Sequence, residues 1–367
     1  MRNLHFVSLS LLFLFLRAVP LSSQVTTHSL TGRTGEGSSY TLGGYVITKA
    51  NATTQDKADK KTDMSLRLVR AYVDGRVKNV QYKVQMQYNG NLSKLDESGI
   101  RLLDAWAEWQ PLTEARLKVG QMKRCFTFEN PMHPWNIGFG AYSQLADRLA
   151  GFNDRVGEQP SNGRDLGVQL QGDLLPARND GHRWLHYQVG VYTGQGVNHA
   201  DANSRKDLIG GIIVSPTKHL QLGVFGWTGD YQKNGITVDR NRYSFGINYN
   251  CNWTVRAELA FSEGHRISDY TLDATTGQYN VAGTDGTDAW YVEVGSPTFL
   301  DSRIFARWDV YREGKDWDAA KTIYALSAQH SFDKNLMLQA NYGFNANKAV
   351  AAGRYYHTID LQLYWRF

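Results

Sequence analysis

The chain has 367 residues, a formal net charge of +5 and a charged fraction of 20%. Lysine and arginine form no run, so the sequence does not have the basic footprint of a nucleic-acid-binding protein. Glycine (35) and tyrosine (20) are abundant and proline (8) is scarce, which is typical of an antiparallel all-β protein with aromatic residues at a membrane interface.

The N-terminus has the pattern of a secretory signal peptide. Arg2 precedes an apolar run at 6–16, and small and polar residues follow at 21–24. The run is too short to cross a bilayer as a helix, and no later stretch approaches the roughly 18 apolar residues that a spanning helix needs. We therefore predict a signal peptide at 1–23 and one exported domain at 24–367 that is not a helical membrane protein.

Segments of alternating apolar and polar residues follow, and each is bounded by Gly, Asn, Asp or Pro. Each is close to the ~9–11 residues that a tilted strand needs to cross the hydrocarbon core. The sequence therefore predicts an all-β fold, a 16-stranded antiparallel transmembrane β-barrel, with the even strand number of single-chain bacterial barrels. The predicted strands lie at 40–49, 62–75, 77–89, 99–110, 114–122, 164–174, 183–193, 206–215, 218–229, 239–250, 253–264, 287–296, 301–313, 320–332, 335–346 and 354–367.

The connections between these strands alternate in length. At one end of the predicted barrel the connections are mostly short turns, with 175–182 as the exception. At the other end they are mostly longer loops. This asymmetry is the pattern of outer-membrane barrels, and a soluble sandwich or propeller offers no reason for it. A propeller is also disfavoured because no repeat of about 40–50 residues is visible.

The third long loop, 123–163, has 41 residues and is the longest. It is rich in aromatic residues, and we expect a short helix at 143–149. A loop of this length inside a compact domain is usually functional. We predict that it folds into the lumen and narrows the pore; a disordered surface loop is the alternative.

The last predicted strand alternates without a break. Its apolar face carries Ile359, Leu361, Leu363, Trp365 and Phe367, and its other face is polar. One apolar and one polar face fit a wall between lipid and water, and an edge strand of a soluble sheet is the alternative. The final Phe367 resembles the assembly signal of bacterial outer-membrane barrels.

Strand parity assigns the faces of the other strands. In 99–110, for example, Leu103 is predicted to face lipid and Asp104 the lumen. The predicted inward charges have both signs, which predicts a mixed lumen whose selectivity depends on the charges at its narrowest point. They are Lys83, Arg116, Lys118, Arg256, Arg307 and Arg366 against Asp104, Glu108, Asp165, Glu258, Glu293, Asp309 and Asp360.

Two strands are ambiguous by parity. In one, Leu66 and Leu68 share a face with Arg70, which requires a bulge or an Arg70 at the water level. In the other, a set that includes Ile323 competes with a set that includes Tyr324 for the lipid face.

Four cations, Lys118, Lys123, Arg124 and Arg148, lie on the fifth predicted strand or on the third loop that follows it. We expect them to gather at the mouth and the constriction. Their summed positive potential would then favour anions there, although the lumen as a whole is mixed.

The sequence offers no catalytic or metal-binding pattern. No CxxC, HExxH, GxSxG or P-loop motif occurs, and the histidines lack metal-ligand spacing. Cys125 and Cys251 are predicted at opposite ends of the barrel and are not expected to pair. His186 and His219 point inward by parity but have no recognisable catalytic partners, so we predict no enzyme activity, cofactor or metal.

Several segments resemble the phosphate-selective porin O and P family of bacterial outer-membrane porins. They are 77–90 (VKNVQYKVQMQYNG), 102–109 (LLDAWAEW), 120–123 (GQMK), 163–172 (GRDLGVQLQG) and 189–196 (VGVYTGQG). The resemblance implies a sixteen-stranded barrel in the outer membrane, assembled as a homotrimer, through which small anions such as phosphate diffuse. It also implies that Lys123, in the G-Q-x-K segment, and Arg164 are anion-binding residues.

We therefore expect an outer-membrane porin for small hydrophilic solutes with a preference for anions. The expected partners are outer-membrane lipid, small anions including phosphate, and further copies of the chain, but no nucleic acid. A barrel enzyme, or a plugged barrel with a binding or structural role, is the alternative, and Trp135, Phe139 and Tyr142 would also suit a sugar path. The candidate pore residues are Lys83, Lys118, Lys123, Arg124, Arg148, Arg164, Arg256 and Arg307.

Overall fold

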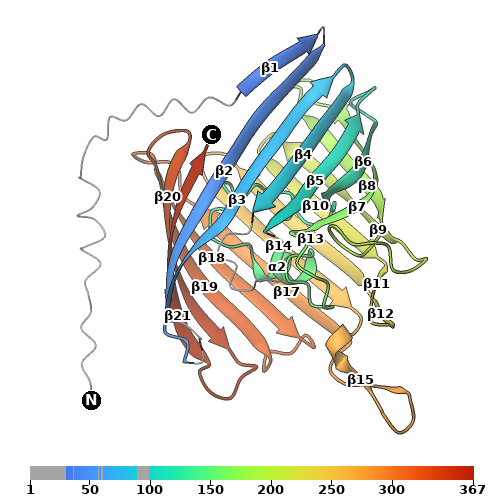
Figure 1. The fold of residues 1–367 in the computed structure, drawn as a ribbon. Helices are drawn as coiled ribbons and strands as arrows, with labels where there is room; N and C mark the ends of the chain where they lie inside the picture. Colours follow the sequence, from blue (N-terminus) through green and yellow to red (C-terminus); the bar gives the residue numbers. More distant parts are fainter. Residues whose placement is uncertain (1–29, 36, 57, 59–60, 89–98) are drawn as a thin grey trace.

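The computed structural model of the chain describes residues 30–35, 37–56, 58, 61–88 and 99–367 (Figure 1). The predicted signal peptide at 1–23 lies outside the described residues. Within the described part, no helix is long and apolar enough to cross a membrane. The helices there are the short α2 (Gln144–Leu149), where the sequence predicts a helix, and the 3-10 turn η2 (Ile267–Asp269).

Sixteen antiparallel strands form a closed barrel, because β2 pairs with β3 on one side and with β21 on the other. Each predicted strand coincides with one of them, and its ends shift by no more than four residues. The strands are β2 (Ser38–Thr53), β3 (Thr62–Val77), β4 (Val80–Tyr88), β5 (Ile100–Trp109), β6 (Arg116–Lys123), β7 (Arg164–Pro176), β8 (Arg183–Tyr192), β9 (Asp207–Thr217), β10 (Leu220–Thr228), β13 (Asn241–Asn250), β14 (Thr254–Glu263), β17 (Gly286–Gly295), β18 (Ser302–Glu313), β19 (Ala320–Ser331), β20 (Leu336–Asn347) and β21 (Tyr355–Arg366).

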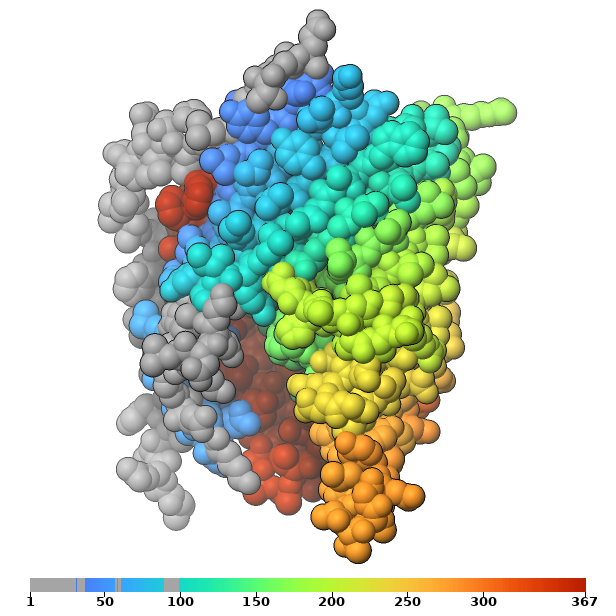
Figure 2. Space-filling model, turned by 45° about the vertical axis from the view of Figure 1, so that its right-hand side comes forward, coloured from blue at the N-terminus to red at the C-terminus, as the bar shows by residue number. Residues whose placement is uncertain are grey.

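Five further strands lie outside this barrel wall, and the sequence did not predict them. β1 (Leu30–Gly35) pairs with the start of β2. The pairs β11 (Asp230–Lys233) with β12 (Ile236–Asp239) and β15 (Tyr270–Leu272) with β16 (Tyr279–Val281) form hairpins inside long loops. The β15–β16 hairpin protrudes from the rim (Figure 1, and at the bottom of Figure 2, in orange).

Alternation along the strands separates a lipid face from an inner face. In β4, Val84 and Met86 are 42% and 50% exposed, whereas Gln85 and Gln87 are 3% and 4% exposed. The exposed residues of the sixteen strands form an apolar outer surface, as the parity of the sequence predicts.

A bulge resolves the ambiguity of β3. Ile47 pairs with Leu68 and the next residue of β2 pairs with Leu66, so Arg67 is an extra residue. Leu66 is therefore exposed on the outside, while Leu68 and Arg70 turn inward. In β19, Tyr324 lies on the exposed outer face.

A second bulge corrects the face of Leu103. Gln85 pairs with Asp104 and Met86 with Leu102, which leaves Leu103 without a partner in the register. Leu103 is fully buried, so the prediction that it faces lipid was wrong. Parity counting fails here because one extra residue reverses every face beyond it.

The last residue, Phe367, closes the seam between β2 and β21. Its N–H donates to the carbonyl of Gly44, and the N–H of Gly44 donates to the carbonyl of Phe367, both at 3.0 Å. The Phe367 ring lies over Gly44, where a Cβ would come within 2.7 Å of the ring. The absence of a side chain at Gly44 therefore makes room for the ring on the outer surface.

We predict that deleting Phe367, or the substitution Phe367→Ser, strongly reduces assembled barrel, because the seam loses its last hydrogen-bonded pair or its ring contact. The measurement is the amount of heat-modifiable protein in the outer membrane, with export measured separately. Phe332→Ser is the control, since Phe332 is also exposed, in the turn between β19 and β20. Normal levels of the Phe367 variants would contradict the prediction.

Candidate functional site

Residues 124–163, between β6 and β7, lie inside the barrel, where Figure 1 shows α2. Their backbone groups bond to inward-facing side chains of strands far away in the sequence. Those side chains are Glu258 on β14, Asp309 on β18, Gln339 on β20 and Gln362 on β21. The segment therefore crosses the interior and is fastened to several walls.

Buried carboxylates anchor this inner loop on the β14–β18 wall. Glu258 accepts hydrogen bonds from the N–H groups of Phe128 (2.6 Å) and Glu129 (2.9 Å). Asp309 accepts from the N–H of Gln144 at 3.0 Å. Glu293 pairs with Arg256 at 3.0 Å. Three of the acidic residues that the sequence assigns to the lumen, Glu258, Glu293 and Asp309, therefore belong to this anchor.

Two predicted pore cations belong to the same anchor. The Arg256 guanidinium donates to the carbonyls of Asn136 (3.0 Å) and Ile137 (3.2 Å). Arg307 donates to the carbonyl of Ala141 at 3.3 Å. Both side chains are at least 92% buried and positioned by loop carbonyls.

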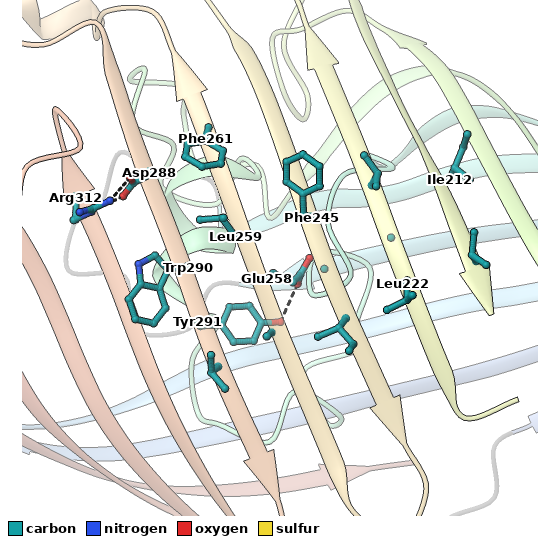
Figure 3. Close-up of a pocket in the computed structure, with 17 residues that line it drawn as sticks. Ile212, Leu222, Phe245, Glu258, Leu259, Phe261, Asp288, Trp290, Tyr291 and Arg312 are labelled. Carbon is teal, nitrogen blue, oxygen red and sulfur yellow. Dashed lines mark hydrogen bonds and ion pairs between the residues drawn. The ribbon is translucent and has the colours of Figure 1, made fainter. Parts of the chain in front are cut away.

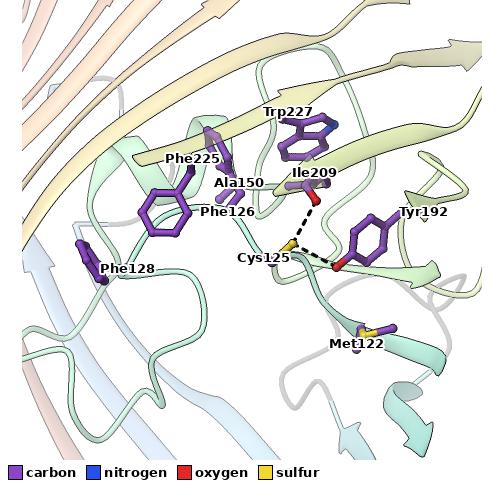
Figure 4. Packing of buried hydrophobic residues seen from close by; sticks show 9 residues of the cluster. All are labelled: Met122, Cys125, Phe126, Phe128, Ala150, Tyr192, Ile209, Phe225 and Trp227. Atoms are coloured by element: carbon purple, nitrogen blue, oxygen red, sulfur yellow. Dashed lines mark hydrogen bonds between the residues drawn. The ribbon is translucent and has the colours of Figure 1, made fainter. Parts of the chain in front are cut away.

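A cluster of buried ion pairs is the second anchor of the inner loop. Arg124, Arg240 and Arg242 are fully buried and lie 4.6–4.8 Å from the ring centroid of Trp227. Their carboxylate partners are Asp154, Glu158, Asp165 and Asp207. Apolar residues pack beside the cluster, and Figure 4 shows Trp227 among Phe126, Phe225 and Tyr192. Arg124 therefore holds the fold together and does not present its charge to the lumen.

Five cations on the opposite side form a set that we call the basic wall: Arg67 and Arg70 on β3, Lys83 on β4, Lys123 on β6 and Arg366 on β21. No ion pair joins any of them to a carboxylate among the residues that the structure describes. Their partners are neutral: Gln87 and Tyr45 for Arg70, Gln362 and Tyr364 for Arg67, and the carbonyl of Asn130 for Lys123. No carboxylate of the described residues therefore forms an ion pair that neutralises the wall.

His133 of the inner loop is exposed and faces this wall, with its ring 4.7 Å from that of Tyr45. Partial desolvation inside the barrel lowers the pKa of His133. The charges of Arg70, Lys83, Lys123 and Arg366 lower it further, to about 3. These four cations therefore raise the positive potential around one point of the loop, and His133 is neutral at neutral pH.

A model of the phosphate-selective porin O and P family matches residues 44–252, which is more than half of the chain. The chain belongs to that family. It is an outer-membrane porin, and its strands cross the bacterial outer membrane. No curated protein sequence matches it significantly.

Solved structures show the same fold at low sequence identity. The anion-selective porin from Comamonas acidovorans is 14% identical, with 90% of this chain and 100% of that chain covered and a TM-score of 0.66. OmpF of Salmonella typhi, in complex with daunomycin, is 11% identical (92% and 100% covered, TM-score 0.67). OmpT, an outer membrane protein of Vibrio cholerae in trimer form, is 12% identical (90% and 100% covered, TM-score 0.61).

The porin does not bring its sequence-predicted cations together as one group. Lys83 and Lys123 lie in the basic wall. Lys118 pairs with a carboxylate of β5 at 3.3 Å, and Arg164 pairs with another carboxylate of that strand at 2.8 Å. Arg148 lies on α2, half exposed, 3.7 Å from Asp147.

The pore residues predicted from the sequence do not include Arg67, Arg70 and Arg366. Arg366 was placed inward by parity but not singled out. The first two were hidden by the bulge in β3, which is visible in the sequence only as a conflict between Leu66 and Arg70. The available signal in the sequence was Arg70, a cation on the apolar face of a predicted strand.

A hollow with a volume of about 950 Å³ lies on the outer surface of the porin, across β9 to β17. Its lining is apolar, and Figure 3 shows Leu222, Phe245, Leu259 and Trp290 along it. It belongs to the lipid-facing surface and not to the lumen. Among the described residues, no group of three or more His, Cys, Asp or Glu side chains could hold a metal ion.

Proposed function

We propose that this porin lets small hydrophilic solutes diffuse across the outer membrane with a preference for anions, phosphate among them, and that the basic wall supplies the preference. The observation that carries the proposal is the set of five cations without carboxylate partners, four of which lower the pKa of His133. The carboxylates of β14, β17 and β18 are instead occupied by Arg256, Arg307 and backbone N–H groups of the inner loop.

The separation of charge matters because interactions in a pore fall with distance and are screened by salt. Charges beyond a Debye length, roughly 8–10 Å, contribute little at physiological ionic strength. An ion that passes the loop meets the basic wall first, since the anchoring carboxylates are buried behind the loop. A lumen that is mixed in composition can therefore act as positive where it is narrow.

We also propose that three copies of the porin assemble as a homotrimer in outer-membrane lipid. The Vibrio cholerae OmpT structure, which has the same fold, is described as a trimer form. The broad apolar outer surface has room for both lipid and neighbouring subunits.

An enzyme function has little support in the described residues. Ser302 contacts the Nδ1 of His330 at 2.9 Å, but no described carboxylate bonds to the His330 ring. His186 does have a carboxylate partner, Asp173, at 2.7 Å, but no described hydroxyl bonds to its ring. A nucleophile, a base and an orienting acid are therefore not assembled at either histidine.

The test of the proposal is the reversal potential of the purified porin in a planar bilayer across a salt gradient. We expect anion selectivity, which Lys83→Glu and Lys123→Glu each reduce. Reversing one charge changes its interaction with an ion ~5 Å away by roughly 0.9 kcal/mol at the dielectric constant of water with physiological screening, or about fourfold in relative permeability. Lys334→Glu, in an exposed turn, is the control.

A cation-selective wild type would overturn the proposal. Unchanged reversal potentials for both Lys83→Glu and Lys123→Glu would show that the basic wall does not set the selectivity. The porin would then be a general diffusion pore. Intact protein without conductance would favour the plugged-barrel alternative.

A further inference from the structure

Besides Arg70 over Tyr45, three cations of the basic wall lie against aromatic rings instead of carboxylates. The distances from the charged group to the ring centroid are 4.8 Å for Lys83 and Tyr72, 5.5 Å for Lys123 and Tyr142, and 4.7 Å for Arg366 and Trp135. A ring attracts a cation through its quadrupole and does not cancel its charge. The wall therefore combines net positive charge with flat apolar surface.

These rings are partly open to the interior. Tyr72, Trp135 and Tyr142 are half-buried, and His133 beside them is exposed. Gly43 on β2 leaves the space for Tyr72, because a Cβ at Gly43 would lie 2.7 Å from the Tyr72 hydroxyl. No hydrogen bond from the Tyr72 side chain to another described residue is present, so contact with its ring face disturbs no polar network.

Two guanidinium groups of the wall have only some of their N–H donors engaged. Arg70 gives its Nε–H to Gln87 at 2.7 Å and an Nη1–H to Tyr45 at 2.6 Å. Arg67 likewise directs Nη1 toward two neutral oxygens on β21. The remaining N–H groups of both are available to an anion. A phosphate can use these donors alone, whereas an aromatic carboxylate can use them and also contact the exposed rings.

We propose that the basic wall selects organic anions that carry a flat aromatic ring, with a lysine or arginine of the wall on the carboxylate and Tyr72, Trp135 or His133 against the ring. This inference rests on the proposed function and adds the substrate class to it. The ring contact contributes beyond charge, because aromatic pairs stabilise more than their buried area alone.

The test uses three anions on the wild-type porin in a planar bilayer: benzoate, cyclohexanecarboxylate and inorganic phosphate. Benzoate and cyclohexanecarboxylate have the same charge and nearly the same size, but only benzoate is flat and aromatic. We expect benzoate to half-block the chloride current at a concentration about two- to tenfold below that of cyclohexanecarboxylate, and also below that of phosphate.

The residue-level test is Tyr72→Leu, which removes the ring, against Tyr72→Phe, which keeps it. We expect Tyr72→Leu to abolish most of the difference between benzoate and cyclohexanecarboxylate and Tyr72→Phe to retain it. Tyr324→Leu, on the lipid face, is the control for loss of a tyrosine. Trp135→Leu is a second variant in case Tyr72→Leu does not assemble, and heat-modifiable migration on gels reports assembly.

The outcomes separate this inference from the proposed function. Equal block by benzoate and cyclohexanecarboxylate in an anion-selective channel overturns the ring inference and leaves the proposed function standing. Strongest block by phosphate does the same. A cation-selective wild type in the same bilayers overturns both.

Discussion

Removing residues 131–142 from the inner loop is expected to raise the single-channel conductance several-fold. This segment is an excursion across the interior whose ends lie close together, because the N–H of Ser143 donates to the Glu129 carboxylate at 3.1 Å. It carries His133 and Trp135, which contact β2 and β21. Without it, a larger cross-section is open to ions, whereas α2 and the buried ion cluster keep their anchors.

The measurement is single-channel conductance of a variant in which two glycines join Asn130 to Ser143. The protein offers a matched control, since the β15–β16 hairpin at 270–281 has the same length of twelve residues and protrudes from the rim. Its deletion should leave the conductance near the wild-type value. If the two deletions gave the same conductance as the wild type, the excursion would not limit the ion path.

We expect Arg240→Met to destabilise the folded porin more than any other single substitution in the buried ion cluster. Arg240 is fully buried and donates to both Glu158 and Asp207. Removing the cation leaves two carboxylates buried without it, and breaking a buried pair in this way costs about 3–5 kcal/mol. The methionine fills the volume, so the loss is chiefly electrostatic.

The expected readout is a lower temperature at which the folded form converts to the unfolded form on gels. Arg205→Met is the control, because Arg205 is half exposed in its contact with Asp239 and such surface pairs are worth about 0–1 kcal/mol. An effect of Arg240→Met no larger than that of Arg205→Met would show that the cluster does not hold the loop.

The destabilisation by Arg240→Met should also depend on pH. Burial already raises the pKa of Glu158, although Arg124 and Arg240 oppose this, and without Arg240 it rises further. When the folded state raises the pKa of a buried carboxyl, the protonated group costs the protein little stability. The protein loses stability as the pH rises through that raised pKa, because the buried group then becomes charged. The variant should therefore be closer to the wild type at pH 5 than at pH 8, and the opposite order would contradict this account.

The sequence by itself determined the barrel. Alternation with a period of two, turn residues between segments and the alternation of short and long connections located all sixteen strands within four residues. These signals are local, because each strand must satisfy lipid on one side and the interior on the other. The family segments at 120–123 and 163–172 pointed to the same kind of protein, and strand parity correctly placed Lys83 inward.

The tertiary structure alone decided which charges face the ion path. Arg124 was expected at the pore mouth, yet it is neutralised by Glu158 and Asp165, residues 34 and 41 positions away. Arg70 joined the basic wall because an extra residue in β3 turned it inward. Strand parity tells the face of a side chain but not its partner across the lumen. Partners are set by where the inner loop crosses the barrel, and that path depends on contacts between distant segments.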